Sequence, residues 1–399
     1  MEKIWINIPD VLFFQEGPGV RNTQYTTEGV KLLNVANLVD GKVDLSKSDR
    51  YISEDEAYGK YKHFLCDAGD FVIASSGIKV EYIDKKMGFV DESMLPLCMN
   101  TSTIRFKVLD DNKLRIRYFM YYLKSQHFKD QLFKQITGSA QLNYGPSHLK
   151  KMIMPLISLS KQDEIIACMD KVQSVIEMRR QELVKLDDLI KARFVEMFGN
   201  PVANDRGWNT LPLENACKSI VDCPHSTPSY TNEDTGFMCI RTSIVKKNKI
   251  LWDDIEYIPE DEFVKRIQRK KPEVGDIVYT REGAILGIAA IIDRDCNVAL
   301  GQRSMLLSPD IDKCTSEFVC VAMNSDSFLD NVLKGVSGSA SPHINVGDIK
   351  AFRMIMPPVE LQKQFSDFVK QVDKSKVAVQ KAFDETQKLF DSLMQRYFG

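Results

Sequence analysis

Several features that would reveal a function directly are scarce or missing in this sequence. Its 399 residues include only five histidines, which are never paired at the spacing of metal ligands. The nine cysteines are an odd number without a CxxC motif, so we expect neither a zinc site nor a disulfide framework. Reduced, mostly buried thiols in a cytoplasmic protein are the simplest interpretation.

Long apolar runs and an excess of one charge are missing too. No stretch approaches the ~18–20 apolar residues of a membrane-spanning helix, and Glu2, Lys3 and Asp10 make the N-terminus a poor signal peptide. The formal net charge of −2 excludes a chain that is basic throughout, although a local basic groove suffices to bind nucleic acid. The length favours about two or three globular domains.

The signatures of common catalytic sites are absent as well. The sequence has no GxxxxGK[ST] phosphate loop and no GxSxG or HExxH motif, and Gly17-Pro18-Gly19 lacks the third glycine of a dinucleotide loop. The only Pro-Pro pair, Pro357-Pro358, opens a predicted helix, which does not fit an adenine methyltransferase motif. An enzyme therefore has no positive support from the residues.

What the sequence does contain is an internal repeat. Residues 162–199 match residues 362–399 without a gap, and both stretches end in Phe-Gly. Shorter matches precede them in the same order: 137–140 with 337–340, 152–155 with 354–357, 51–56 with 257–262, and Gly69-Asp70 with Gly275-Asp276. The repeat predicts the order domain, long helix, domain, long helix.

The repeated tails have the apolar period of a coiled coil. The exceptions are Arg179 and Arg193 in the first tail and Lys376 and Thr386 in the second. A seam of this kind favours knobs-into-holes pairing, whereas the alternative is an ordinary amphipathic helix on its own domain. At 1.5 Å per residue each helix would be roughly 55–60 Å long. The predicted seam comprises Ile165, Met169, Val172, Ile176, Leu183, Leu186, Ile190, Phe365, Val369, Val372, Val379, Phe383, Phe390 and Leu393.

The remaining sequence predicts mixed helix and strand, so the fold class is α+β. Short β-rich runs at 30–35, 70–74 and 276–280 are separated by Gly, Asp and Asn, and helices are expected near 117–133 and 316–333. We predict two α/β domains at 1–155 and 201–357, each followed by a spacer helix, at 156–200 and 358–399.

Basic clusters occupy the same place in both halves. Lys60, Lys62 and His63 precede Gly69-Asp70, and Lys265-Arg266 with Arg269-Lys270-Lys271 precede Gly275-Asp276. This recurrence indicates phosphate contacts from a loop, and the alternative is a solvated surface. Two glycine loops, with Ser139 and Gln141 and with Ser339 and Ser341, suit phosphate as well, unless they are simple turns.

Polar residues that could read bases follow the next strand in each half. Ser75-Ser76 with Lys79 occupies this place in the first half, and Arg281-Glu282 in the second. Arginine can read guanine edges and glutamate can accept from cytosine N4, whereas the alternative for Arg281-Glu282 is a local ion pair. Gln302-Arg303, after a short apolar strand, is a third candidate.

Together the duplicated segments resemble the specificity subunit of Type I restriction–modification systems. The resemblance is carried by the two glycine-serine loops, the two Met-Ile-Met-Pro segments and the heptad helices that begin near Gln162 and Gln362. Gly17-Pro18-Gly19-Val20-Arg21, before Asn22, and the segment 222–228, with His225 and Thr227, resemble opening loops of the family's target recognition domains. Leu156 and Lys161 are minor departures from the family pattern.

The resemblance implies a DNA-binding subunit that has no catalysis or cofactor of its own. It implies two modification subunits, which bind S-adenosylmethionine and methylate adenine, and restriction subunits, which use ATP and Mg. If the two helices pair antiparallel, the two domains are related by a pseudo-two-fold axis although the sequence repeat is direct. Because the domains have diverged, they would read two different half-sites of one DNA target. The length of the helices would set the spacer between these half-sites.

The residues expected to contact DNA are those of the two opening loops, the basic clusters and the polar loops. They are Arg21, Asn22, Lys60, Lys62, Ser75, Ser76, Lys79, Ser139, Gln141, His225, Thr227, Lys265, Arg266, Arg269, Arg281, Glu282, Gln302, Arg303, Ser339 and Ser341. Two alternatives stay open: a scaffold whose domains bind protein or carbohydrate, and a fused nuclease or methyltransferase fragment.

Overall fold

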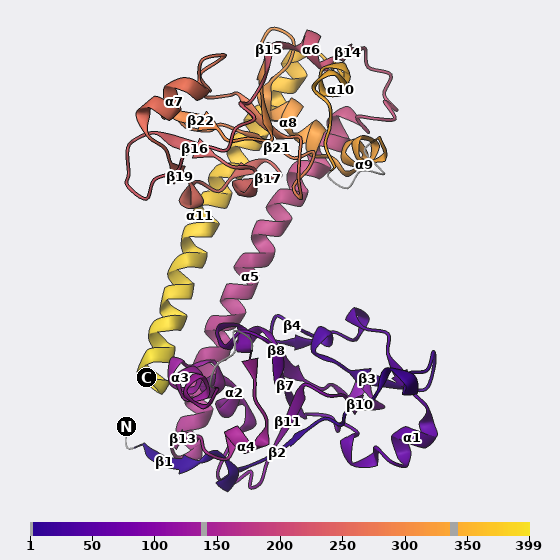
Figure 1. Cartoon of the computed structure of the whole chain (residues 1–399), viewed down its shortest axis with the longest axis vertical. Coiled ribbons are helices and arrows are strands. Elements are labelled where there is room, and N and C mark those ends of the chain that lie inside the picture. Colours follow the sequence, from indigo (N-terminus) through magenta and orange to yellow (C-terminus); the bar gives the residue numbers. More distant parts are fainter. Residues whose placement is uncertain (1–2, 137–141, 336–341) are drawn as a thin grey trace. The chain divides into compact units, whose positions relative to one another are not determined.

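The computed structural model describes residues 3–136, 142–335 and 342–399 (Figure 1). The chain divides into two compact units. Unit 1 comprises Met1–Met178 with Phe383–Gly399, and unit 2 comprises Arg179–Ala382. Each unit therefore contains one domain, one part of the first long helix and one part of the second.

Unit 1 is built on two small sheets whose strands carry the predicted β-rich runs. The central strand pair is antiparallel and buried on both faces, because all four residues of Phe71–Ala74 are buried. One sheet has the order β2 (Leu12–Glu16), β11 (Thr103–Val108), β7 (Phe71–Ala74), β9 (Met87–Phe89); the other has β10 (Leu97–Met99), β3 (Val30–Leu33), β6 (Tyr51–Ile52).

Unit 2 repeats this topology. Its four-stranded sheet has the order β15 (Cys217–Asp222), β23 (Ser304–Pro309), β20 (Ile277–Thr280), β21 (Ala289–Ile291). Its three-stranded sheet has the order β19 (Glu256–Tyr257), β16 (Met238–Ile240), β22 (Val298–Leu300). In both units the three-stranded sheet contains one parallel and one antiparallel pairing, so the sequence repeat is also a structural repeat.

Smaller elements complete both units. Two-stranded ladders pair β1 (Ile4–Asn7) with β13 (Ile153–Leu156), β14 (Thr210–Pro212) with β24 (Arg353–Ile355), β4 (Leu38–Val39) with β5 (Lys42–Val43), β17 (Val245–Lys246) with β18 (Lys249–Ile250), and β8 (Ser76–Ile78) with β12 (Leu142–Asn143). Short helices are α1 (Glu54–Tyr58), α4 (Pro146–Leu149), α6 (Leu213–Ala216), α7 (Glu260–Arg266) and α10 (Val346–Ala351).

The helix expected near 117–133 is two helices, which corrects the sequence interpretation. α2 (Ile116–Lys124) ends at Ser125, and α3 (Gln126–Gln135) begins there. Unit 2 has the same break at Ser325, between α8 (Ser316–Asn324) and α9 (Asp326–Lys334). Each serine hydroxyl accepts from the backbone N–H three residues later, at 3.2 and 3.3 Å, so it caps the second helix.

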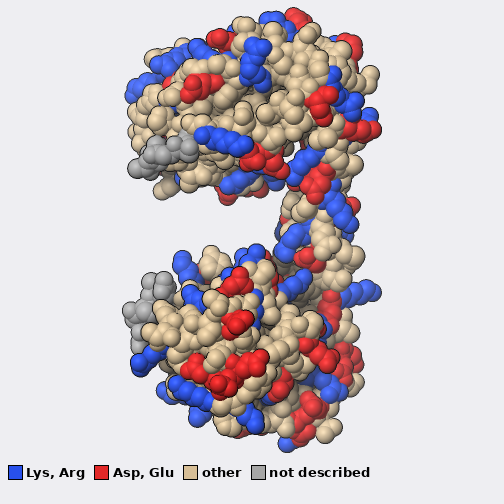
Figure 2. All heavy atoms as spheres, turned by 90° about the vertical axis from the view of Figure 1, so that its right-hand side faces the viewer, with Lys and Arg blue, Asp and Glu red and all other residues tan. Residues whose placement is uncertain are grey.

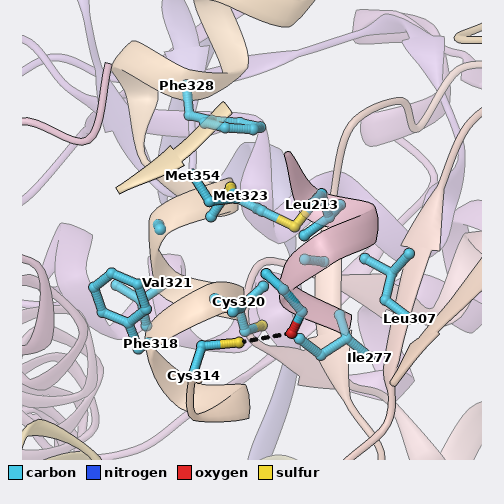
Figure 3. Close-up of a cluster of buried hydrophobic side chains, with 14 of the residues drawn as sticks. Leu213, Ile277, Leu307, Cys314, Phe318, Cys320, Val321, Met323, Phe328 and Met354 are labelled. Carbon is cyan, nitrogen blue, oxygen red and sulfur yellow. Dashed lines mark hydrogen bonds between the residues drawn. The ribbon is translucent and has the colours of Figure 1, made fainter. Parts of the chain in front are cut away.

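The core of unit 2 lies between its four-stranded sheet and α8 (Figure 3). Ile277 and Leu307 from the sheet and Phe318 from α8 belong to one buried cluster. The Cys314 thiol donates to the Ala216 carbonyl oxygen at 3.2 Å, and burial raises its pKa to about 12. Seven of the nine cysteines are buried, as the sequence indicates.

The two longest helices are α5 (Leu159–Phe198) and α11 (Val359–Phe398), each of 40 residues. In unit 1, Ile165 and Met169 near the start of α5 share a core with Met394 and Phe398 at the end of α11. In unit 2 the end of α5 shares a core with the start of α11. The helices are therefore antiparallel wherever they pack. None of the described helices is apolar enough over a sufficient length to cross a membrane.

Every predicted seam residue is buried or half-buried, whereas Met178 and Val184, which lie off the seam, are exposed. The heptad pattern missed the last aromatic residue of each helix. The Phe398 ring lies 5.3 Å from the Tyr118 ring in unit 1, and the Phe198 ring lies 4.9 Å from the Phe318 ring in unit 2. The repeated Phe-Gly ending was the available signal for this contact.

Candidate nucleic-acid interface

In unit 1 the polar loops meet at one end of the four-stranded sheet. The Ser75 N–H donates to the Ser102 carbonyl at 2.8 Å, and the Gly17 N–H donates to the Thr103 carbonyl at 2.8 Å. The Tyr144 N–H closes the set by donating to the Ser75 carbonyl at 3.0 Å. We call this meeting point junction 1, and it joins the chain after β2, the chain after β7 and the chain before β11.

Unit 2 has the same junction with the same backbone hydrogen bonds. The Arg281 N–H donates to the Arg303 carbonyl at 3.0 Å, and the Cys223 N–H donates to the Ser304 carbonyl at 3.3 Å. The Ile344 N–H donates to the Arg281 carbonyl at 2.8 Å. This set is junction 2. Loops that the sequence predicted separately, around 222–228, 281–282 and 302–303, are therefore neighbours.

The side chains of junction 1 are small and mostly neutral. The buried Ser75 hydroxyl donates to Glu16 Oε1 at 3.1 Å, and the Ser76 and Ser102 hydroxyls are 2.6 Å apart. Gly17 is required for close approach, because a Cβ there would lie 2.1 Å from the Asn100 carbonyl oxygen. Of the predicted contact residues here, Ser76 remains partly accessible and Ser75 does not.

Junction 2 is charged, and its buried centre is Arg281. The Arg281 Nε lies 3.1 Å from Asp222 Oδ1, and its Nη2 lies 2.7 Å from Glu282 Oε1. The side chain is 7% exposed. The structure thus contains the local ion pair considered for Arg281-Glu282, and it gives Arg281 a positioning role between two carboxylates. A base contact by Arg281 stays a prediction.

The opening loop of unit 2 is held by two further arginines. The Arg266 side chain, which is also buried, donates from Nη2 to the Ser226 carbonyl at 2.7 Å and pairs with Glu262 at 2.7 Å. The Arg269 Nη1 donates to the Asp222 carbonyl at 3.1 Å. These bonds fix a loop whose residues His225 and Thr227 are exposed.

The repeated Gly-Asp pairs form structural turns. Gly69 and Gly275 have φ of +85° and +91°, which suits glycine. The buried Asp70 accepts from the Asp67 N–H at 2.9 Å and pairs with Arg105 at 3.3 Å. The sequence interpretation did not include Arg105. This arginine lies within strand β11 and is buried, and nothing in the sequence distinguishes it from an exposed arginine.

Asp276 is the corresponding residue of unit 2. It accepts from the Glu273 N–H at 2.9 Å, and its carboxylate lies 2.7 Å from Lys270 Nζ. Burial disfavours the charged lysine, but hydrogen bonds to Asp276 and Glu273 outweigh it and raise the Lys270 pKa. Lys270 is thus engaged by two carboxylates, whereas its neighbour Arg269 is exposed and donates to one backbone carbonyl.

Most of the other predicted contact residues face solvent. Lys265 is exposed and lies 3.1 Å from Asp261 Oδ2, and Glu282 and Gln302 are half-buried. The exposed ones are Arg21, Asn22, Lys60, Lys62, Lys79, His225, Thr227, Lys265, Arg269 and Arg303. The glycine-loop residues Ser139, Gln141, Ser339 and Ser341 lie outside the described residues.

A basic cavity in unit 1 was only partly anticipated. It has a volume of about 400 Å³, and its lining includes Lys79, Tyr82, Lys85 and Lys86. Only Lys79 was predicted, although the Lys85-Lys86 pair was a visible signal. Figure 2 shows lysine and arginine interspersed with acidic residues over the displayed face, so positive charge does not cover that face of either unit.

In residues 3–136, 142–335 and 342–399, no group of three His, Cys, Asp or Glu side chains is placed to share a metal ion. The cation, amide and hydroxyl of Arg303, Gln302 and Thr227 in junction 2, and the Ser76 hydroxyl in junction 1, are groups that contact phosphates and base edges.

Comparison with known proteins agrees with this geometry. A family model for the Type I restriction modification DNA specificity domain matches residues 26–187 and again residues 207–386. The Type I restriction enzyme MjaVIII specificity subunit of Methanocaldococcus jannaschii is 22% identical over 336 residues, which cover 78% of this chain and 74% of that protein.

Two solved structures share the fold. A Type I restriction–modification S subunit from M. genitalium matches with a TM-score of 0.54 and 15% identity, over 100% of this chain and 96% of that one. A chain from a study of complex assembly and conformational transition of the type I R-M system matches with a TM-score of 0.53 and 17% identity, over 99% and 97%.

Proposed function

Because the chain belongs to the Type I restriction–modification DNA specificity family, we propose that it reads a bipartite, asymmetric DNA target with one half-site per unit. The observation that carries the proposal is the pair of junctions, which share backbone hydrogen bonds but differ in their side chains. The same backbone hydrogen bonds hold the loops of both units, so the loops occupy equivalent positions in the two units. Different side chains on that frame select different bases, so the two half-sites differ.

The proposed binding mode separates positioning from reading. Exposed lysines and arginines such as Lys60, Lys62 and Arg269 contact phosphates and set the register without selecting sequence. Exposed or half-buried polar residues at the junctions, such as Ser76, Thr227 and Gln302, contact base edges. The buried Arg266 acts through the loop that it holds, and Arg281 lies between Asp222 and Glu282 at the same junction.

The proposed partners supply the chemistry. Two modification subunits would bind S-adenosylmethionine and methylate adenine, and restriction subunits would use ATP and Mg to translocate and cleave DNA; this chain would bind none of these cofactors. The proposed compartment is the cytoplasm. Apolar residues of the long helices that lie off the seam, such as Met178, Val184 and Leu189, are exposed and offer docking surface to the modification subunits.

The test is methylome sequencing of a host that carries this chain with its modification subunit. One bipartite motif with two different half-sites and a fixed spacer is expected. A continuous or palindromic motif contradicts the two-reader proposal. The same host with the modification subunit alone is the control, and it should lack the motif.

A scaffold that binds protein or carbohydrate is not favoured by the family assignment. It is distinguished by a gel-shift of random duplex DNA at rising salt. The proposed function predicts retention that falls steeply as salt rises, because phosphate contacts release counterions. A scaffold shows no salt-sensitive retention.

A further inference from the structure

Arg303 of junction 2 has a backbone conformation that arginine rarely adopts. Its φ is +71°, in the left-handed region where a side chain is strained and glycine is favoured. Ser102, the equivalent residue of junction 1, has a φ of +67°. Both junctions therefore have this backbone conformation at the same place, but only unit 2 has an arginine there.

The Arg303 side chain brings no visible stabilisation in return. It is exposed, and within residues 3–136, 142–335 and 342–399 its guanidinium takes part in no ion pair or hydrogen bond. The two buried arginines nearby differ in this respect, because Arg266 and Arg281 each lie against carboxylates and carbonyl groups. Stability alone would favour glycine at position 303.

The Arg303 side chain passes over Gly283. A Cβ at Gly283 would lie 3.6 Å from Arg303 Nη1, so the arginine lies over a residue without a side chain. Gln302 is adjacent in sequence, and the Thr227 hydroxyl lies 3.4 Å from Gln302 Oε1. Residues 302 and 303 therefore offer an amide and a guanidinium in consecutive positions of the loop, and both groups can contact base edges.

Building on the proposed function, we propose that Arg303 is the residue that reads a guanine in the half-site recognised by unit 2. Its parallel N–H donors match the O6 and N7 acceptors of guanine in the major groove. The junction holds the backbone of Arg303 through the Arg281 N–H, but the arginine side chain adds no ion pair or hydrogen bond of its own among the described residues, and strained backbone of this kind is common at functional positions. In unit 1 the same place holds Ser102, whose hydroxyl is already bonded to Ser76, so that half-site lacks this guanine contact.

The test compares three variants in selection from a random duplex library, using the full chain with its modification subunit. Glycine suits the backbone conformation at position 303, so the midpoint temperature of thermal unfolding should not fall in Arg303→Gly. The preference for guanine at one position should fall about tenfold to a hundredfold, with all other positions unchanged. Arg303→Lys keeps the charge but loses the paired donors, so it should lose the same preference.

Arg294→Ala is the matched control, because Arg294 is an exposed arginine of unit 2 that pairs with Asp293 instead. It should leave selection unchanged. If Arg303→Gly weakens all sequences alike and Arg303→Lys restores binding, Arg303 contacts phosphate and the inference is wrong. Unchanged selection by Arg303→Gly also overturns it. A wild-type complex that selects no sequence instead contradicts the proposed function itself.

Discussion

Gln162 and Gln362 make the same three hydrogen bonds in their respective units. The Gln162 side chain accepts from the Arg115 N–H at 2.8 Å and donates to the Lys113 and Ile157 carbonyls at 2.8 and 2.9 Å. Gln362 bonds to the equivalent backbone groups of Thr315, Lys313 and Pro357. Both glutamines are fully buried and tie the start of a long helix to its own domain.

Replacing either glutamine by alanine should therefore destabilise its unit. Each change leaves one buried N–H and two carbonyl groups without their partner, which costs about 1–3 kcal/mol. Urea unfolding should show the loss as a lower midpoint. Gln364→Ala is the control, because Gln364 is exposed on the same helix. Equal effects at positions 362 and 364 would mean that the buried bonds contribute nothing.

The repeat, the β-rich runs and the helix seam could be predicted because they are local patterns. Apolar residues at coiled-coil spacing indicate a helix face whatever the rest of the chain does. Even here one alignment was shifted. The Met-Ile-Met-Pro segments match at 152–155 and 354–357, but the glutamine hydrogen bonds and the β-ladders place Met154 and Met354 in equivalent positions.

The burial of Arg266 and Arg281 could not be predicted, because each has, besides a local carboxylate, a partner that is distant in sequence. The charge and loop position of Arg281 predict a base contact, which is untested, but they do not predict its ion pair with Asp222, far earlier in the chain. Arg266 is engaged in the same way by Ser226. Sequence shows which residues carry charge, but burial of that charge is decided by tertiary contacts.

A charge inside the helix seam should release the end of α11 from unit 1. Met169 is fully buried beside Met394 and Phe398, so Met169→Asp places an uncompensated carboxylate among apolar side chains. We expect a loss of about 3 kcal/mol or more in unfolding free energy. Met178→Asp, at a position that is 57% exposed on the same helix, should change little.

A thiol reagent gives an independent measure of the same release. Cys168 is half-buried, and the Tyr397 hydroxyl of α11 lies 3.9 Å from its sulfur. Met169→Asp should speed modification of Cys168 as the end of α11 moves away. Cys66 should stay unreactive at pH 8. Burial raises the pKa of its thiol to about 12, so almost none of it is in the reactive thiolate form at that pH. An unchanged Cys168 rate contradicts the predicted release.

Phosphate contacts by the first basic cluster predict a specific salt effect. Lys60 and Lys62 are exposed, so replacing both by alanine should weaken all duplexes alike. In a plot of the logarithm of the DNA-binding constant against the logarithm of the salt concentration, the slope should become shallower by about two units, because each phosphate contact contributes about 0.9 to it. Lys363→Ala is a suitable control, since Lys363 pairs with Glu360 on α11. A change in base preference would instead assign these lysines to reading.

Exchange of one domain should change one half-site only. The domain must keep the residues that receive the helices: Arg115 for Gln162, and Tyr118 and Tyr122 for the Phe398 ring. A chimaera that replaces residues 1–150 with the matching domain of a relative, while keeping these contacts, should retain the other half-site and the spacer. Methylome sequencing with the modification subunit checks this. A change in both half-sites would contradict independent reading.

The spacer should instead respond to helix length. Inserting four residues after Val184 adds about 6 Å to α5, nearly two base-pair steps. Val184 is exposed, and four residues are close to one helical turn, so the seam is roughly preserved with a stutter. Both half-sites should persist and the spacer should lengthen. If the methylome shows an unchanged spacer, the helices do not set the distance between half-sites; if a half-site changes, the insertion has disturbed a reader.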